Sequence, residues 1–145
     1  MEVYTIGFTK RTAAEFFEAL KRAGVRRLLD VRLNNSSQLA GFTKKEDLRF
    51  FLNEICGIEY IHEPLLAPTQ DLLDDYKKKK GSWQDYQGRF LRLMEQRKIE
   101  ERIGRRLFEV PTALLCSETT AEHCHRRLVL EYLQKKWGDL TMIHL

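Results

Sequence analysis

The sequence predicts a single-domain three-layer α/β sandwich, with a mostly parallel sheet and helices on both faces. Short apolar segments bounded by glycine, proline or polar residues alternate with longer segments of helical periodicity. The apolar segments are nearly continuous, which is typical of strands covered on both faces. The chain has 145 residues and contains no repeat or linker-like tract, so we expect one domain over residues 1–145.

The first elements are a strand, a helix and a second strand. Residues 3–6 are β-branched or aromatic and are followed by glycine, so they predict a buried strand. Thr12 and Glu15 have the spacing of a capping box, and Gly24 is a typical end for the helix that they begin. Residues 25–31 predict the second strand.

The middle of the chain is predicted to be mainly helical. A polar turn over residues 33–41 precedes a helix that carries Leu48, Phe51, Leu52 and Ile55. Residues 58–61 predict a third strand, and residues 72–80 a weaker helix. A further helix is indicated by an apolar stripe at three- and four-residue steps, which is more typical of a core face than of a cofactor site: Trp83, Tyr86, Phe90 and Met94.

The last third predicts a strand, a helix and a final strand. Residues 110–116 form an apolar strand with Pro111 at its start. Thr119 or Thr120 is expected to cap a helix that runs to about Trp137. Residues 140–144 predict the closing strand.

Composition favours a cytoplasmic globular protein. No apolar segment approaches the roughly 18 residues of a membrane span, and no signal-peptide pattern follows Met1. The three cysteines are odd in number and lack the spacing of a disulfide framework, so we expect free thiols in a reducing compartment. These features argue against secreted, membrane and fibrous proteins.

Residues 77–106 are strongly basic. They hold eleven Lys or Arg against four acids, a local charge of +7 in a chain of net charge +4. Such a segment attracts nucleic acid, and Tyr76, Trp83 and Tyr86 offer rings for stacking. The alternative is a solvated helix face, because acids occur among the cations at helical spacings.

Polar and nucleophilic residues follow three of the predicted strands, where an open parallel sheet binds its ligands. These residues are Gly7, Phe8 and Thr9; Asp30 and Arg32; and Cys116, Ser117 and Glu118, followed by Cys124, His125 and Arg126. We expect Cys116 to be a nucleophile or redox thiol, and Asp30, Glu118 and His125 to transfer protons. Arg32 and Arg126 would hold a phosphate or carboxylate, with the binding site completed by Gly7, Thr9, Ser117 and Cys124.

Each assignment has a structural alternative. Cys116 could be a small buried apolar residue, Asp30 and Arg32 a partly buried ion pair, and His125 a satisfied core histidine. Cys56 lies on a predicted helix without a partner motif and is expected in the core.

We expect no metal ion and no cofactor. Cys116, His123, Cys124 and His125 are enough ligands for zinc, but their spacing is not that of the common zinc motifs. If Cys124 and His125 are adjacent on a helix, their side chains project about 100° apart. Dinucleotide, P-loop, HExxH and GxSxG signatures are absent, and the distance from Cys116 to Arg126 disfavours rhodanese-like sulfur transfer.

The chain resembles the domain-of-unknown-function 488 family. The resemblance rests on TIGFT at residues 5–9, LDVR at 29–32, ALLCSE at 113–118 and CHR at 124–126. The family carries TIGHS, DVR and ALLCAE followed by CHR in the same order, which implies a bacterial or archaeal α/β domain without a defined substrate. Phe8 stands where the family often has histidine, and Ala121 where it often has proline.

We therefore expect an enzyme-like anion site at the carboxyl edge of the sheet, with a small anionic ligand or a nucleotide as partner. The alternatives are a nucleic-acid-binding or regulatory module that uses residues 77–106 without catalysis, and an interaction domain whose cysteines are structural.

Overall fold

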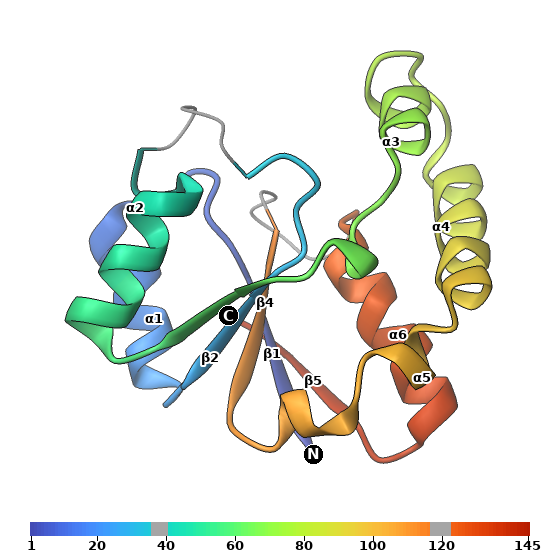
Figure 1. Cartoon of the computed structure of the whole chain (residues 1–145). Helices are drawn as coiled ribbons and strands as arrows, with labels where there is room; N and C mark the ends of the chain where they lie inside the picture. The colour runs from blue at the N-terminus through green and yellow to red at the C-terminus, as the bar shows by residue number, and fades with distance from the viewer. Residues whose placement is uncertain (36–40, 117–122) are drawn as a thin grey trace.

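A five-stranded, all-parallel sheet forms the middle layer of the protein (Figure 1). In this computed structural model, which describes residues 1–35, 41–116 and 123–145, the strands are β1 (Glu2–Gly7), β2 (Arg27–Asp30), β3 (Glu59–His62), β4 (Thr112–Cys116) and β5 (Thr141–His144). Their order across the sheet is β3-β2-β4-β1-β5, so β4 lies at the centre. The predicted α/β class with a parallel sheet is confirmed.

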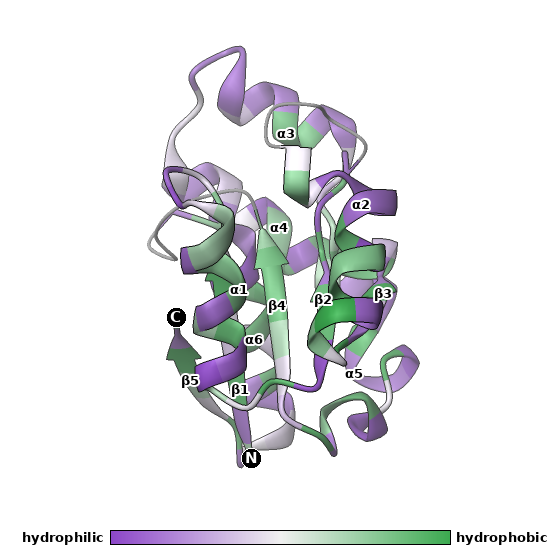
Figure 2. Ribbon diagram, turned by 90° about the vertical axis from the view of Figure 1, so that its left-hand side faces the viewer, coloured by the Kyte–Doolittle hydropathy of each residue, from purple (hydrophilic) through white to green (hydrophobic). Residues whose placement is uncertain are grey.

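Helices cover both faces of the sheet (Figure 1). On one face lie α1 (Ala13–Arg22), α2 (Lys45–Phe50) and the π-helical turn η2 (Phe51–Cys56). On the other, α6 (His125–Trp137) packs on β4 and β1, and α4 (Trp83–Arg97) packs on α6. The helix α3 (Gln70–Lys77) packs on α4, and α5 (Ile99–Arg102) packs on both α4 and α6. Short 3-10 turns lie at η1 (Gly41–Thr43), η3 (Pro64–Leu66) and η4 (Arg105–Phe108). Figure 2 shows the apolar β4 between the two helical layers.

Each helical layer has its own apolar core. Phe16 and Leu20 of α1 pack with Leu28 of β2 on one side of the sheet. Phe90 and Met94 of α4 pack on the other side, which confirms that the apolar stripe of α4 is a core face. None of the described helices is long and apolar enough to cross a membrane.

The capping box of α1 forms as the sequence predicts. The hydroxyl of Thr12 accepts a hydrogen bond from the Glu15 amide at 3.1 Å, and the Glu15 carboxylate accepts one from the Thr12 amide at 3.0 Å. Beyond the C-cap, Gly24 has a φ of 72°, a conformation in which glycine is favoured.

The helix expected to carry Leu48, Phe51, Leu52 and Ile55 is interrupted. The α-helix α2 ends at Phe50, and the backbone continues as the π-helical turn η2. Leu48 and Leu52 are buried, but Ile55 is 65% exposed. A π turn has more residues per turn than an α-helix, so later side chains rotate away from the face that a 3.6-residue period predicts.

The start of α6 differs from the prediction. The helix begins at His125, later than a cap at Thr119 or Thr120 would give, and those two threonines lie outside the described residues. Cys124 is the N-cap, with an extended backbone (φ −133°, ψ 139°). Cys124 therefore precedes the helix instead of lying on its surface.

The chain connections diverge at the carboxyl end of β4. The helices that follow β1 and β2, α1 and α2, lie on one face of the sheet, whereas α6, which follows β4, lies on the opposite face (Figure 1). In the sheet register Gly7 pairs with Cys116, and Asp30 pairs with Leu115. This divergence is the position at which open parallel sheets bind ligands.

Candidate functional site

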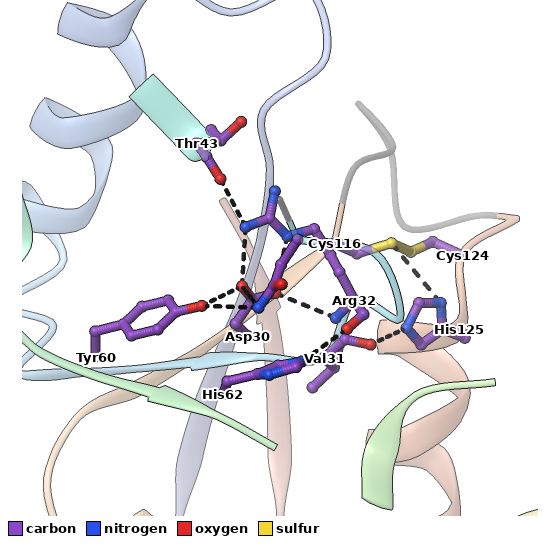
Figure 3. A network of polar contacts seen from close by, with 10 residues as sticks. Asp30, Val31, Arg32, Thr43, Tyr60, His62, Cys116, Cys124 and His125 are labelled. Atoms are coloured by element: carbon purple, nitrogen blue, oxygen red, sulfur yellow. Dashed lines mark hydrogen bonds and ion pairs between the residues drawn. A yellow bond between two sulfur atoms is a disulfide. The ribbon is translucent and has the colours of Figure 1, made fainter. Parts of the chain in front are cut away.

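Two cysteines and a histidine meet at the end of β4 and form what we call the sulfur centre: Cys116, Cys124 and His125 (Figure 3). Cys116 is the last residue of β4, and its sulfur is bonded to that of Cys124 in a disulfide. Nδ1 of His125 lies 3.8 Å from Sγ of Cys116. The three residues are 3%, 2% and 8% exposed, so the centre is buried.

The disulfide corrects the expectation of free thiols. The two cysteines are separated by eight positions; Cys116 ends β4 and Cys124 immediately precedes α6. The pairing of Cys116 with Cys124 depends on how β4 and α6 are placed relative to each other. The cysteine spacings that identify disulfide-rich proteins do not reveal such a pairing. Cys56 is a free cysteine, and burial raises the pKa of its thiol.

The imidazole of His125 is oriented by the backbone of the neighbouring strand. Its Nε2 lies 2.7 Å from the carbonyl oxygen of Val31, which can only accept a hydrogen bond. Nε2 therefore carries the proton, and in the neutral ring Nδ1 keeps its lone pair. That lone pair belongs to the atom facing the sulfur of Cys116 (Figure 3).

The extended backbone at Cys124 brings its sulfur and the His125 ring to the same side. The expected divergence of about 100° applies to two residues on one helix, and Cys124 is outside the helix. The two sulfur atoms and Nδ1 of His125 all lie within 4.8 Å of one another. The sulfur centre therefore gathers three atoms that could ligate a metal ion.

A second buried cluster lies at the end of β2, and we call it the aspartate network: Asp30, Arg32, Asn35, Thr43 and Tyr60 (Figure 3). Arg32 donates from Nε and Nη2 to the two carboxylate oxygens of Asp30, each at 2.8 Å. Its Nη2 also donates to the Thr43 carbonyl at 2.7 Å. Asp30 accepts further hydrogen bonds from the Tyr60 hydroxyl at 2.5 Å, from Asn35 at 3.5 Å and from the Arg32 amide at 3.2 Å.

These contacts keep Asp30 ionised. Burial by itself would raise the pKa of Asp30, but the hydrogen bonds and charge of Arg32, with the Tyr60 hydroxyl, outweigh it and lower the pKa below its ordinary value. Burial and the nearby Asp30 carboxylate raise the pKa of Tyr60, so the phenol stays protonated as a donor. Of the two alternatives for Asp30 and Arg32, this geometry favours the ion pair over proton transfer.

Two adjacent backbone carbonyl groups at the end of β2, those of Val31 and Arg32, connect the aspartate network with two histidine rings. The Val31 carbonyl accepts from His125, and the next carbonyl, that of Arg32, lies 3.0 Å from Nε2 of His62 on β3. Phe8, which occupies the position where the family often has histidine, packs its ring 5.4 Å from the Arg32 guanidinium. The network thus fixes the strand end that orients His125.

The other expected site residues have different surroundings. Gly7 pairs with Cys116 in the sheet, and Thr9 follows β1 at the same edge. Arg126 is 1% exposed. Burial, followed by the positive charges of Arg126 and Arg127, lowers the pKa of His144 on β5. Ser117 and Glu118 lie outside the described residues.

Four polar residues of this edge were not predicted from the sequence: Asn35, Thr43, Tyr60 and His62. His62 could have been found, because parallel pairing of the third strand with the second places it beside Asp30. Asn35 and Thr43 come from the connection between β2 and α2, and no sequence pattern sets its path.

Of the three rings expected to stack on bases, Tyr86 is buried, whereas Tyr76 and Trp83 are partly buried. Tyr86 is 3% exposed and stacks on Trp83 at 5.3 Å between ring centroids, while His123 covers Trp83 at 4.9 Å. Several cations are paired, among them Lys79 and Arg89, which contact Asp75 at 3.3 and 2.8 Å. Nucleic-acid binding by residues 77–106 stays a prediction.

A family model described as "Domain of unknown function DUF488" matches residues 12–133 of the chain. The match includes the ends of β2 and β4 and the start of α6. No curated protein and no solved structure matches the chain.

Proposed function

This chain belongs to the domain of unknown function DUF488 family, and we propose that it functions through a redox-active cysteine pair, Cys116 and Cys124. The observation that carries the proposal is the contact of His125 Nδ1 with the Cys116 sulfur at 3.8 Å, beside a disulfide at the central strand end. The proposed reaction is thiol–disulfide exchange with a small disulfide. The burial of both sulfurs favours a small substrate over a protein substrate.

Each side chain has a distinct role in the proposed reaction. His125 takes the thiol proton of reduced Cys116 on Nδ1, because its Nε2 proton is held by the Val31 carbonyl. Cys124 is the resolving cysteine. Its position at the N-cap of the 13-residue helix α6 stabilises its thiolate.

The reaction balances in two steps. The Cys116 thiolate attacks one sulfur of the substrate disulfide, and the S–S bond of the substrate breaks to release one thiol. The Cys124 thiolate then attacks the Cys116 sulfur of the mixed disulfide and releases the second thiol. Two electrons pass from the cysteine pair to the substrate, and the two thiol protons pass to the two products.

The contacts of Arg32 argue against the anion site that the sequence led us to expect. The Arg32 guanidinium is already bound by the Asp30 carboxylate and the Thr43 carbonyl. Binding of phosphate, a nucleotide or another small anion at this edge stays a prediction, and the Discussion gives its test.

The experiment measures exchange between the reduced protein and oxidised glutathione, followed by the appearance of reduced glutathione. The wild type should reduce one equivalent of oxidised glutathione per chain. Cys116→Ser and Cys124→Ser should not complete the reaction. His125→Gln should slow it by about 10²-fold, because glutamine can donate to the Val31 carbonyl but has no basic nitrogen.

His62→Gln is the matched control. His62 also contacts a backbone carbonyl through Nε2, that of Arg32, but it contacts no sulfur in the described structure. Its exchange rate should equal that of the wild type. Equal rates for His125→Gln and His62→Gln would contradict the role of His125, and exchange that persists in Cys116→Ser would contradict the role of the cysteine pair.

A further inference from the structure

We propose that the reduced sulfur centre binds one Zn²⁺ ion, with the Cys116 and Cys124 thiolates and Nδ1 of His125 as ligands. The inference uses the reduced cysteine pair of the proposed function, and it adds a metal to that site. The sequence analysis expected no metal, partly because Cys124 and His125 would diverge on a helix. The extended N-cap removes that objection.

The positions of the ligand atoms fit a zinc ion. Zn–S bonds of about 2.3 Å and Zn–N bonds of about 2.0 Å place tetrahedral ligand atoms about 3.5–3.8 Å apart. Nδ1 of His125 is 3.8 Å from the Cys116 sulfur, and the three ligand atoms lie within 4.8 Å of one another. The Cα atoms of the two cysteines are 7.2 Å apart, beyond the range of about 4.4–6.8 Å of most disulfides. Once the disulfide is reduced, this spacing allows the sulfurs to separate around an ion.

The surroundings of His125 are those of a metal ligand. A histidine that binds a metal usually donates its other ring N–H to a carbonyl or carboxylate, which fixes the ring and leaves the ligating nitrogen unprotonated. The Val31 carbonyl accepts from Nε2 at 2.7 Å, and Nδ1 is the nitrogen that faces the Cys116 sulfur (Figure 3).

The charge balance also favours a divalent ion. Two thiolates in a buried site repel each other and lose their hydration, so without a cation both cannot easily be ionised. One Zn²⁺ with two thiolates and a neutral imidazole has no net charge, which suits residues that are 2–8% exposed.

The donor set selects zinc over hard cations. Thiolate and imidazole ligands suit zinc, whereas Mg²⁺ and Ca²⁺ prefer oxygen. The described residues supply two Cys and one His, and tetrahedral coordination leaves a fourth position, which water or substrate occupies in catalytic zinc sites.

Zinc binding and the disulfide exclude each other, because the same two sulfurs either ligate as thiolates or bond to one another. When a small disulfide oxidises the zinc-bound pair, the two thiolates give up two electrons and form the Cys116–Cys124 bond. The substrate takes up these two electrons together with two protons from water as it becomes two thiols, and Zn²⁺ is released.

The test uses full-length protein that is reduced, stripped of metal with a chelator, mixed with zinc chloride and desalted, with bound zinc measured by mass spectrometry. The reduced wild type should retain one zinc per chain, and the oxidised wild type none. Cys124→Ser and His125→Gln should lose zinc on the column. Cys56→Ser, the matched cysteine control outside the sulfur centre, should retain it.

Two further measurements keep the proposal testable if a variant does not fold. Zinc should protect Cys116 and Cys124 of the wild type from alkylation, and cobalt(II) should give the thiolate charge-transfer and tetrahedral visible bands. Equal zinc in the reduced and oxidised wild type would overturn the site. Exchange with oxidised glutathione without zinc retention would overturn only the zinc site, and zinc retention without exchange only the proposed function.

Discussion

The ends of β2 and β4 both carry buried side chains with polar or sulfur atoms, but the contacts that these side chains make are different. At the end of β2, the Asp30 carboxylate and the Arg32 guanidinium neutralise each other and are bound by the rest of the aspartate network. At the end of β4, the sulfur centre holds two sulfurs and an imidazole nitrogen. The chemistry that we propose for these three atoms is exchange of electrons, protons or a metal ion.

We infer from this difference that the aspartate network holds the backbone in position, whereas the sulfur centre carries the reactive groups. Ion pairs that are buried and fully bonded hold a structure in place, and their pKa values move away from neutrality. The aspartate network secures the strand whose Val31 carbonyl orients His125. The comparison therefore predicts that changes at β2 alter mainly stability, whereas changes at β4 alter mainly reactivity.

Loss of the Asp30 carboxylate should have the largest effect. Asp30→Ala leaves the Arg32 guanidinium buried without its counter-ion, so we expect the free energy of unfolding to fall by about 3–5 kcal/mol. Urea denaturation measures this loss. The exposed pair of Arg105 with Asp139 provides the control, because Asp139→Ala removes a partner that water can replace and should leave the free energy of unfolding nearly unchanged.

The stability that Asp30→Ala loses should depend on pH. The pKa of Asp30 is lowered in the folded protein, so its contribution is complete above the unfolded pKa of about 4 and is lost as the pH falls through the folded value. The stability difference between the wild type and Asp30→Ala should therefore shrink below about pH 4. A difference that stays constant on acidification would contradict the ion pair.

Reduction of the disulfide should have an intermediate effect. The bond closes a loop with a sequence separation of 8, and a loop of this size stabilises the folded state by about 2–3 kcal/mol. Thermal melts with and without a phosphine reductant measure this effect. The double variant Cys116→Ala, Cys124→Ala should melt identically under both conditions, and a wild type indifferent to reductant would argue against the bond.

Substitution of Arg32 by lysine should have the smallest effect. Lysine keeps the charge beside Asp30 but loses the paired hydrogen bonds and the bond to the Thr43 carbonyl, for a cost of about 1–2 kcal/mol. Because Arg32 is internally neutralised, added phosphate should not stabilise the wild type more than the variant. If Arg32 did bind phosphate, a phosphate concentration of ten times Kd would raise the free energy of unfolding of the wild type by about 1.4 kcal/mol, and the variant would lack this gain.

The order and type of the main elements could be predicted from the sequence because local signals determine them. The capping box of Thr12 and Glu15 sets the start of α1, and the apolar segment ending at Cys116 sets β4. The exposure of Ile55 could not be predicted, because a helical period assumes 3.6 residues per turn and the backbone at η2 is wider.

The candidate site was predicted in location but only partly in arrangement. The rule for parallel sheets predicted Asp30, Cys116 and His125 at one edge; in the structure β2 and β4 end side by side, and α6 begins at His125, whose ring faces the Cys116 sulfur. The pairing of Cys116 with Cys124 depends on where α6 begins. The bond of Tyr60 to Asp30 depends on strand register and side-chain reach, which periodicity does not contain.

The most direct test of the account counts free thiols in the folded protein across glutathione redox buffers, by alkylation and peptide mass spectrometry. Under oxidising conditions we predict that Cys56 alone is free, and under reducing conditions that all three cysteines are free. Cys116 and Cys124 should change together in one reversible two-electron transition. Cysteines that change separately as glutathione adducts, or that stay free in every buffer, would contradict the redox pair at the end of β4.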